Sequence, residues 1–140
     1  MSVTVWVATD LAAFEALART FARELRAGDT VALEGTMGAG KTTFVAAVLR
    51  GLGRDAEVAS PTFTFWHRYG GEPPIEHLDF YRIEHRAEAT ELGLEEAFSS
   101  RGIAFVEWPE ILPDLVPPGA IRVRISGAGD APRELRIERP

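Results

Sequence analysis

The chain has 140 residues, a hydrophobic content of 46 %, a net charge of −6 at pH 7 and no cysteine. This length predicts one domain, residues 1–140. The lack of cysteine excludes disulfides and thiolate metal sites, and the acidic balance argues against binding nucleic acid alone. We find no run of 18 apolar residues and no signal peptide, so we expect a cytoplasmic protein that does not associate with membranes.

The first part of the chain predicts two strands and two helices. Valines alternate with other residues over 3–7, which indicates a strand. Apolar residues recur every three or four positions over 11–25, which indicates a helix that closes near Gly28. Residues 30–34 form an apolar run typical of a buried strand, and residues 43–50 have helical character. A glycine-rich segment separates these last two elements.

The middle of the chain continues with the same two kinds of element. A turn leads into an aromatic strand within residues 57–69, and another strand follows over 75–81. Residues 86–99 have helical character, and we expect Leu92 to face the core together with other apolar side chains of this helix. The apolar run 103–106 predicts a short strand that is buried on both faces.

The last part of the chain predicts a hairpin. Residues 121–125 and 135–137 alternate as strands around Gly127–Asp130, which is rich in turn residues. Strands that alternate with helices favour an α/β fold. We therefore expect a three-layer α/β domain whose mixed sheet has a parallel core and additional antiparallel strands.

The glycine-rich segment Gly35–Thr42 reads GTMGAGKT and matches G-x-x-x-x-G-K-[ST], the pattern of a phosphate-binding loop, or P-loop. It joins the predicted strand 30–34 to the predicted helix 43–50, and a helix start presents free N–H groups to phosphates. Of the 15 Lys and Arg residues only Lys41 is a lysine, whose compact ammonium fits between phosphates. Thr42 offers a hydroxyl to Mg²⁺. The sequence therefore predicts a P-loop NTPase-like fold.

A P-loop protein needs a further carboxylate for Mg²⁺, usually at the end of a buried strand. Glu107 follows the apolar run 103–106, whereas Asp79 ends a segment that alternates, so the pattern favours Glu107 as the nearer metal ligand. Either carboxylate could instead cap a helix or pair with an arginine, and Arg82 follows Asp79 by three residues. Both are candidate catalytic and metal-binding residues.

Three other residues each have a chemical and a structural interpretation. Trp108 follows Glu107 on the ligand side of an α/β sheet, but a tryptophan is as often part of the core. Thr62 follows a proline in a loop, where it fits either a switch segment that senses Mg²⁺ and the γ-phosphate or ordinary turn chemistry. His77 is more often a hydrogen-bonded strand histidine than a catalytic base.

The chain contains no asparagine and no glutamine. It therefore lacks the Asn-Lys-x-Asp motif with which Ras-like GTPases read guanine, and it has no glutamine to orient an attacking water. Hydrolysis must use a carboxylate, a threonine hydroxyl, a histidine or a residue of a partner. We expect slow intrinsic turnover that depends on a partner.

Four motifs and one shorter segment occur in a characteristic order. They are GTMGAGKTT at Gly35–Thr43, SPTF at Ser60–Phe63, HLDFYR at His77–Arg82, Glu91–Gly93, and VEW at Val106–Trp108. Together they resemble the TsaE (YjeE) family of small bacterial P-loop ATPases, which are needed to make threonylcarbamoyladenosine at A37 of tRNA. The resemblance covers nearly the whole chain. The family often has Asp-Leu after the first glycine, whereas this chain has Thr36 and Met37.

The resemblance implies ATP as the nucleotide, Mg²⁺ as the metal and a complex with the TsaB–TsaD pair, in which TsaD carries the transfer chemistry. By position, Lys41 and the loop amides hold the β- and γ-phosphates. Thr42 and Glu107 hold Mg²⁺, and Asp79 lies near the metal or its water. The implied nucleotide-binding residues are Met37, Gly38, Ala39, Gly40, Lys41, Thr42, Thr43, Trp108 and Arg133.

A small-molecule kinase of the P-loop class is the alternative. It would need an acceptor pocket and an arginine-bearing lid over the γ-phosphate, and Arg82 and Arg86 could form that lid. A chain of 140 residues leaves little room for an acceptor domain. A nucleotide-gated binding module with negligible turnover is a third possible function. Phosphate release measured with and without acceptors and partner proteins would separate the three.

Overall fold

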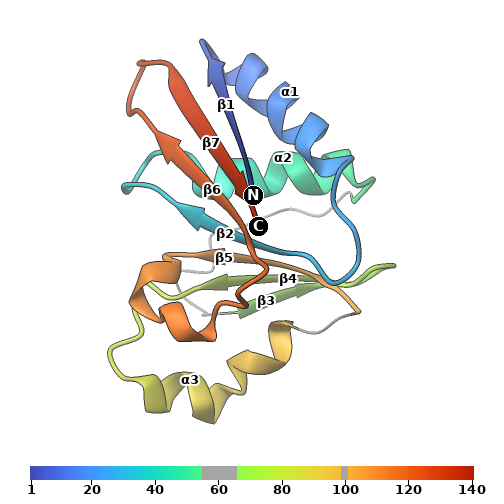
Figure 1. Cartoon of the computed structure of the whole chain (residues 1–140), viewed down its shortest axis with the longest axis vertical. Helices are drawn as coiled ribbons and strands as arrows, with labels where there is room; N and C mark the ends of the chain where they lie inside the picture. The colour runs from blue at the N-terminus through green and yellow to red at the C-terminus, as the bar shows by residue number, and fades with distance from the viewer. Residues whose placement is uncertain (55–65, 99–100) are drawn as a thin grey trace.

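The computed structural model describes residues 1–54, 66–98 and 101–140 (Figure 1). Thr62, the SPTF motif and most of the predicted strand 57–69 lie outside the described residues. Within them, one seven-stranded sheet has the order β1-β7-β6-β2-β5-β4-β3. The strands are β1 (Ser2–Ala8), β2 (Thr30–Glu34), β3 (Trp66–Tyr69), β4 (Ile75–Asp79), β5 (Ile103–Glu107), β6 (Ile121–Ser126) and β7 (Arg133–Arg139). The α-helices are α1 (Leu11–Ala22), α2 (Lys41–Gly51) and α3 (Arg86–Leu92), and the 3₁₀ helices are η1 (Leu94–Phe98), η2 (Pro109–Ile111) and η3 (Pro113–Leu115).

The sheet is mixed, as the sequence predicts. The P-loop strand β2 pairs in parallel with β5 on one side and with β6 on the other, and β4 pairs in parallel with β5. The strands β7, β1 and β3 extend this core in antiparallel pairings. The C-terminal hairpin therefore supplies one strand of the parallel core, β6, and one antiparallel strand, β7.

The two faces of the sheet carry two separate cores, because neighbouring residues of a strand point to opposite faces. On β2, Val31 and Leu33 belong to the core beneath α1 and α2, whereas Ala32 belongs to the core beneath α3 and the 3₁₀ helices. Phe21 of α1 meets Phe44 of α2 edge to face, with ring centroids 5.4 Å apart. Figure 1 shows α1 and α2 beside each other and α3 in a separate layer, so the three predicted layers are present.

Two predicted helices end earlier than their sequence patterns indicate. The first, α1, ends at Ala22 rather than near Gly28. The predicted helix 86–99 divides into α3 and η1 at Gly93, whose φ of +68° favours glycine. Leu92 is consequently 49 % exposed, so its predicted place in the core is wrong. None of the helices in the described ranges is both long and apolar enough to cross a lipid bilayer.

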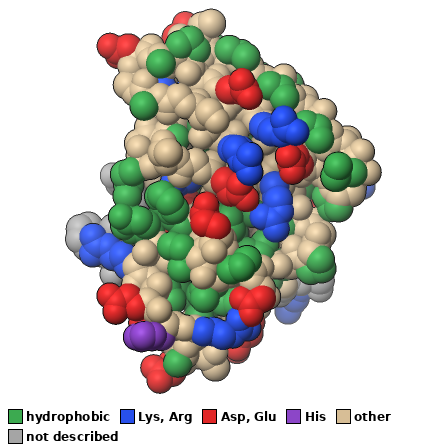
Figure 2. Space-filling model, turned by 60° about the vertical axis from the view of Figure 1, so that its left-hand side comes forward, with side chains coloured by type: hydrophobic (Ala, Val, Ile, Leu, Met, Phe, Trp, Pro, Cys, Tyr) green, Lys and Arg blue, Asp and Glu red, His purple; other side chains and the backbone are tan. Residues whose placement is uncertain are grey.

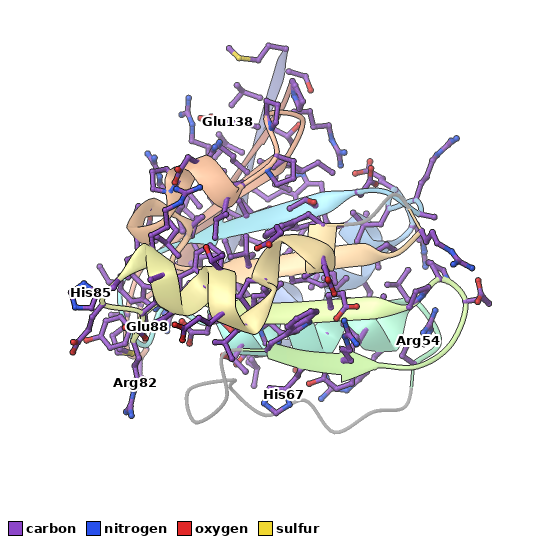
Figure 3. All side chains as sticks on the ribbon, turned by 90° about the horizontal axis from the view of Figure 1, so that it is seen from below. Arg54, His67, Arg82, His85, Glu88 and Glu138 are labelled. Carbon is purple, nitrogen blue, oxygen red and sulfur yellow. The ribbon has the colours of Figure 1, made fainter. Side chains whose placement is uncertain are left out.

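The strand β4 also ends two residues before its predicted end. The Oδ1 atom of Asp79 accepts a hydrogen bond from the N–H of Tyr81 at 2.8 Å, which turns the chain out of the sheet. The chain then reaches α3, which begins with a capping box in which the His85 N–H donates to Glu88 at 3.2 Å. Figure 3 shows Arg82, His85 and Glu88 together at this end of the molecule.

Candidate nucleotide-binding site

The P-loop joins the buried strand β2 to the start of α2. Gly40, the residue before α2, has a φ of +112°, a left-handed conformation that favours glycine. A Cβ atom at Gly40 would also lie 3.3 Å from the Phe14 ring of α1, so glycine lets the loop pack closely against α1. The start of α2 has no side-chain cap, so its first N–H groups are available to an anion.

Lys41 folds back into the loop that precedes it. Its ammonium donates to the carbonyl oxygen of Gly35, lies 3.4 Å from that of Thr36, and lies 3.8 Å from the centroid of the Trp108 ring. Burial lowers the pKa of Lys41, and nearby acidic side chains, above all Glu107, oppose this shift. The ammonium is thus held by neutral groups, from which it can move to a phosphate oxygen.

Glu107, the last residue of β5, connects the sheet to the P-loop helix. Its carboxylate accepts a hydrogen bond from the Thr42 hydroxyl, with distances of 3.2 Å to Oε2 and 3.4 Å to Oε1. The Nε2 atom of His77 on β4 lies 2.6 Å from the same Oε2, and both side chains are buried. The structure therefore places Glu107, which the sequence favours as the nearer metal ligand, beside the hydroxyl expected to bind Mg²⁺.

Asp79 lies next to Glu107 because β4 and β5 pair in parallel with these two residues in register. Its carboxyl is buried, and burial raises its pKa; the Tyr81 N–H opposes this shift, and the charge of Glu107 adds to it. The hydrogen bond from Tyr81 makes Asp79 the cap of a turn at the end of β4, whereas the structural role considered from the sequence is to cap a helix or to pair with an arginine. A buried carboxyl with a raised pKa is also a suitable proton acceptor.

The oxygen atoms at this site fit a Mg²⁺ ion that a nucleotide shares. Within the described part of the chain, no group of three or more His, Cys, Asp or Glu side chains could hold a metal by itself. Thr42, Glu107 and Asp79 nevertheless supply hydroxyl and carboxylate oxygens, the ligands that Mg²⁺ prefers, and in such sites phosphate oxygens and waters complete the coordination. Two neighbouring buried carboxylates also favour a cation between them.

A cavity of about 470 Å³ opens beside these groups, and we call it the carboxylate side of the P-loop. It brings together residues from three parts of the sequence, namely Lys41, Thr42, Thr43, Asp79, Glu107 and Trp108. The backbone of Trp108 has a φ of +58°, which is unusual for a residue other than glycine, and its ring lies 4.9 Å from that of Tyr81. Met37 and Tyr81 are exposed at the edge of the cavity.

A second cavity, of about 450 Å³, shares the P-loop with the first, and we call it the hairpin side. It is bordered by the start of α1 with Phe14, by Gly38–Gly40 and by the hairpin between β6 and β7. Arg133 on β7 donates from Nε to the carbonyl oxygen of Ala39 at 2.9 Å and from a terminal nitrogen to that of Ala131 at 2.6 Å. Its guanidinium therefore ties the hairpin to the P-loop.

The structure thus divides the predicted site residues. The carboxylate side is lined by the predicted residues Lys41, Thr42, Thr43, Asp79, Glu107 and Trp108, whereas Arg133 lies on the hairpin side. Arg82 also lines the carboxylate side, but Arg86, the other arginine considered as a lid, pairs with Asp114. Thr62 falls outside the described residues.

Two features of the site have no signal in the local sequence. Phe14 reads as one apolar residue of an amphipathic helix, and nothing near it indicates that its ring packs on Gly40. The contact between His77 and Glu107 joins residues 30 positions apart. It depends on β4 and β5 being neighbours, which a single sequence does not specify.

The outer face of β6 and β7 carries balanced charges. Figure 2 shows basic and acidic side chains interspersed over one face of the molecule. Arg122 and Arg124 pair with Glu34 at 3.3 and 3.0 Å, and Arg136 pairs with Glu138 at 2.9 Å. Because each arginine lies beside a glutamate, these strands do not form a basic surface for a nucleic acid backbone.

Comparison with known proteins confirms the family resemblance. The family model described as "Threonylcarbamoyl adenosine biosynthesis protein TsaE" matches residues 8–135. A tRNA threonylcarbamoyladenosine biosynthesis protein TsaE from Bacillus subtilis is 40 % identical over 122 residues, covering 86 % of this chain and 76 % of the relative. The same protein of Treponema pallidum is 32 % identical over 115 residues, covering 82 % and 85 %. The crystal structure of Bacillus subtilis YdiB matches with a TM-score of 0.82 and 32 % identity over 97 % of this chain and 84 % of that one. The chain therefore belongs to the TsaE family of tRNA threonylcarbamoyladenosine biosynthesis proteins.

Proposed function

We propose that this protein binds ATP with Mg²⁺, hydrolyses it slowly on its own and acts with the TsaB–TsaD pair in the threonylcarbamoyladenosine modification of tRNA at A37. One observation carries the proposal: the Thr42 hydroxyl lies 3.2 Å from the Glu107 carboxylate at the start of α2, next to Lys41. A P-loop lysine, a metal-binding hydroxyl and a strand-end carboxylate are the parts that phosphoryl transfer requires.

Lys41 and the first N–H groups of α2 bind the phosphates. The ammonium exchanges the carbonyl oxygens of Gly35 and Thr36 for a phosphate oxygen, a charged acceptor that forms a stronger hydrogen bond. Thr42 and Glu107 hold Mg²⁺, which neutralises phosphate charge when it is bound. Because these side chains lie in a buried site, the electrostatic interactions there are stronger than they would be in water.

In this proposal Asp79 accepts a proton from the attacking water. Its buried carboxyl borders the cavity next to Glu107, and its oxygen atoms can accept a hydrogen bond from a water there. Few other side chains can orient the water or stabilise the γ-phosphate. The chain has no Asn or Gln, and Arg82 is the one arginine among the described residues that lines this cavity. Few groups therefore stabilise charge that develops on the γ-phosphate, which supports slow intrinsic turnover.

The edge of the carboxylate side supports activity that depends on a partner. Met37 and Tyr81 are 64 % and 46 % exposed there, beside the partly exposed Trp108. Exposed apolar side chains around a polar site are typical of a protein-binding surface. A partner that covers this edge would exclude water and could supply a cation in trans, and such a cation accelerates related P-loop enzymes by about 10³–10⁵.

Nucleotide binding and phosphate release test the proposal together. Addition of Mg–ATP should change the fluorescence of Trp108, judged against Trp108→Phe because Trp6 and Trp66 also emit. Phosphate release by the isolated protein should be slow and should rise severalfold when TsaB–TsaD is added. Brisk turnover by the isolated chain that TsaB–TsaD leaves unchanged would contradict the proposal and favour the small-molecule kinase.

A further inference from the structure

The two buried carboxylates at the cavity are held by different kinds of partner. The carboxyl of Asp79 is fixed by the backbone N–H of Tyr81 at 2.8 Å. The carboxylate of Glu107 is held by side chains, namely the Thr42 hydroxyl at 3.2 Å and the His77 imidazole at 2.6 Å. The shortest of these contacts, and therefore the one that best defines the orientation of Glu107, is the contact with His77.

The sheet places His77 behind the cavity rather than in it. β4 and β5 run in parallel, with His77 opposite Phe105 and Asp79 opposite Glu107. Residues two apart share a face of a strand, so His77 and Glu107 both project toward the layer of α2, which carries Thr42. The described residues that line the carboxylate side include Glu107 but not His77.

The imidazole has a specific role in this contact. A carboxylate only accepts hydrogen bonds, so beside ionised Glu107 the imidazole takes the tautomer with Nε2–H, and this group donates a hydrogen bond to Oε2. The other ring nitrogen, Nδ1, is buried without a hydrogen-bond partner among the described residues. An aliphatic side chain at this position would avoid that unpaired polar atom, so the imidazole costs stability that the Nε2 contact has to offset.

We propose that His77 is a positioning residue that orients Glu107 for the metal site. Its Nε2 holds Oε2, which leaves Oε1, with a longer contact of 3.4 Å to the Thr42 hydroxyl, available to Mg²⁺. Without the imidazole, the carboxylate can turn toward the ammonium of Lys41, whose pKa it already influences. His77 touches neither the phosphates nor the metal, and this inference rests on the proposed binding of ATP with Mg²⁺.

Three substitutions at His77 test this role through binding rather than turnover. His77→Gln keeps an N–H donor near the position of Nε2, His77→Asn has an amide too short to reach it, and His77→Leu has no donor. The measurement is the affinity for a fluorescent, slowly hydrolysed ATP analogue, with Mg²⁺ titrated in one series and EDTA present in the other. The Asn and Leu variants should need about 10–100-fold more Mg²⁺, the usual effect of losing such a supporting contact. The Gln variant should recover most of that loss, and all three should bind the analogue in EDTA as wild type does.

His67→Gln is the matched control. His67 pairs with His77 across β3 and β4, stacks on Tyr69, and is not among the described residues lining the cavity, so this variant should behave as wild type. The inference is overturned if the Asn and Leu variants need no more Mg²⁺ than wild type, or if all three variants lose equal affinity in EDTA, which indicates general damage. If the Leu variant does not fold, the comparison of Gln with Asn decides. Failure of the wild-type protein to bind the analogue would instead reject the proposed function.

Discussion

The two cavities beside the P-loop have similar volumes, about 470 and 450 Å³, but different chemistry. On the carboxylate side, Lys41, Asp79 and Glu107 are all buried. On the hairpin side, Phe14 supplies apolar surface, and the Arg133 guanidinium donates to backbone carbonyl oxygens. One side thus concentrates buried ionisable groups, whereas the other has exposed aspartates and an arginine that fixes the backbone.

This difference indicates a division of roles. Burial is the main cause of both the lowered pKa of Lys41 and the raised pKa of Asp79, so the protein disfavours the charge on each until a ligand compensates it. The hydrogen bonds of Arg133 go to neutral carbonyl groups and need no ligand. We infer that the carboxylate side carries out the chemistry, whereas the hairpin side holds the loop in shape.

The largest effects should come from the carboxylates, and the two should affect different steps. Asp79→Ala should lower phosphate release in the presence of TsaB–TsaD by about 10²-fold or more, because the proton acceptor is lost. Glu107→Ala should mainly raise the Mg²⁺ concentration needed for nucleotide binding. Phosphate release and Mg²⁺ titrations measure the two effects. If Glu107→Ala gives the wild-type Mg²⁺ curve, Glu107 is not the nearer metal ligand.

The next largest effect should come from Lys41. Lys41→Arg keeps the charge, but the planar guanidinium is too large for the space between the loop carbonyls and Trp108. The affinity for Mg–ATP measured by calorimetry should fall by about 10–100-fold, the range for losing a hydrogen bond to a charged group. Arg50→Lys is the control on the same helix, where the exposed Arg50 pairs with Glu15. Wild-type affinity in Lys41→Arg would contradict this role of the ammonium.

A substitution on the hairpin side should have a smaller effect. Arg133→Ala removes the guanidinium that joins Ala39 to the hairpin, so it should weaken Mg–ATP binding by a few-fold without changing the Mg²⁺ requirement. Arg133→Lys should behave like Arg133→Ala, because a single ammonium cannot reach the carbonyl oxygens of both Ala39 and Ala131. If Arg133→Lys instead retained the affinity that Arg133→Ala loses, the charge of Arg133 would matter more than its geometry, as expected for a residue that contacts a nucleotide phosphate.

The sequence predicts the carboxylate side better than the hairpin side for a physical reason. The P-loop is a continuous segment, and its strand and helix follow from local patterns, so the positions of Lys41 and Thr42 need little knowledge of the fold. Glu107 is recognisable because it ends a run of buried residues. The contact between Arg133 and Ala39 spans 94 positions and depends on where the hairpin packs.

Local patterns also identify an element more reliably than the face it buries. The alternation over residues 3–7 correctly predicts β1, yet Val3 and Val7 are exposed, and it is Trp6 that packs against the core. Strand period alone does not decide which face is covered; here the position of α1 decides it. The prediction that Leu92 is buried is wrong for a related reason. Gly93 ends α3 directly after Leu92, so the helical periodicity that predicts a buried face does not continue past this residue.

The smallest expected effect concerns the stability of the protein without nucleotide. Because burial raises the pKa of Asp79, ionised Asp79 destabilises the fold above that pKa, and the destabilisation is relieved as the pH falls toward the ordinary aspartate value of 3.8. Asp79→Asn keeps an oxygen that can accept the Tyr81 N–H but removes the charge. The midpoint of thermal unfolding should therefore rise by about 2–4 °C near neutral pH, and this difference from wild type should shrink toward about pH 4. Asp130→Asn, at an exposed aspartate on the hairpin side, should leave the midpoint unchanged. A lower midpoint for Asp79→Asn at neutral pH would show that the ionised carboxylate stabilises the fold. It would contradict the inference that burial disfavours the charge of Asp79, on which the contrast between the two sides depends.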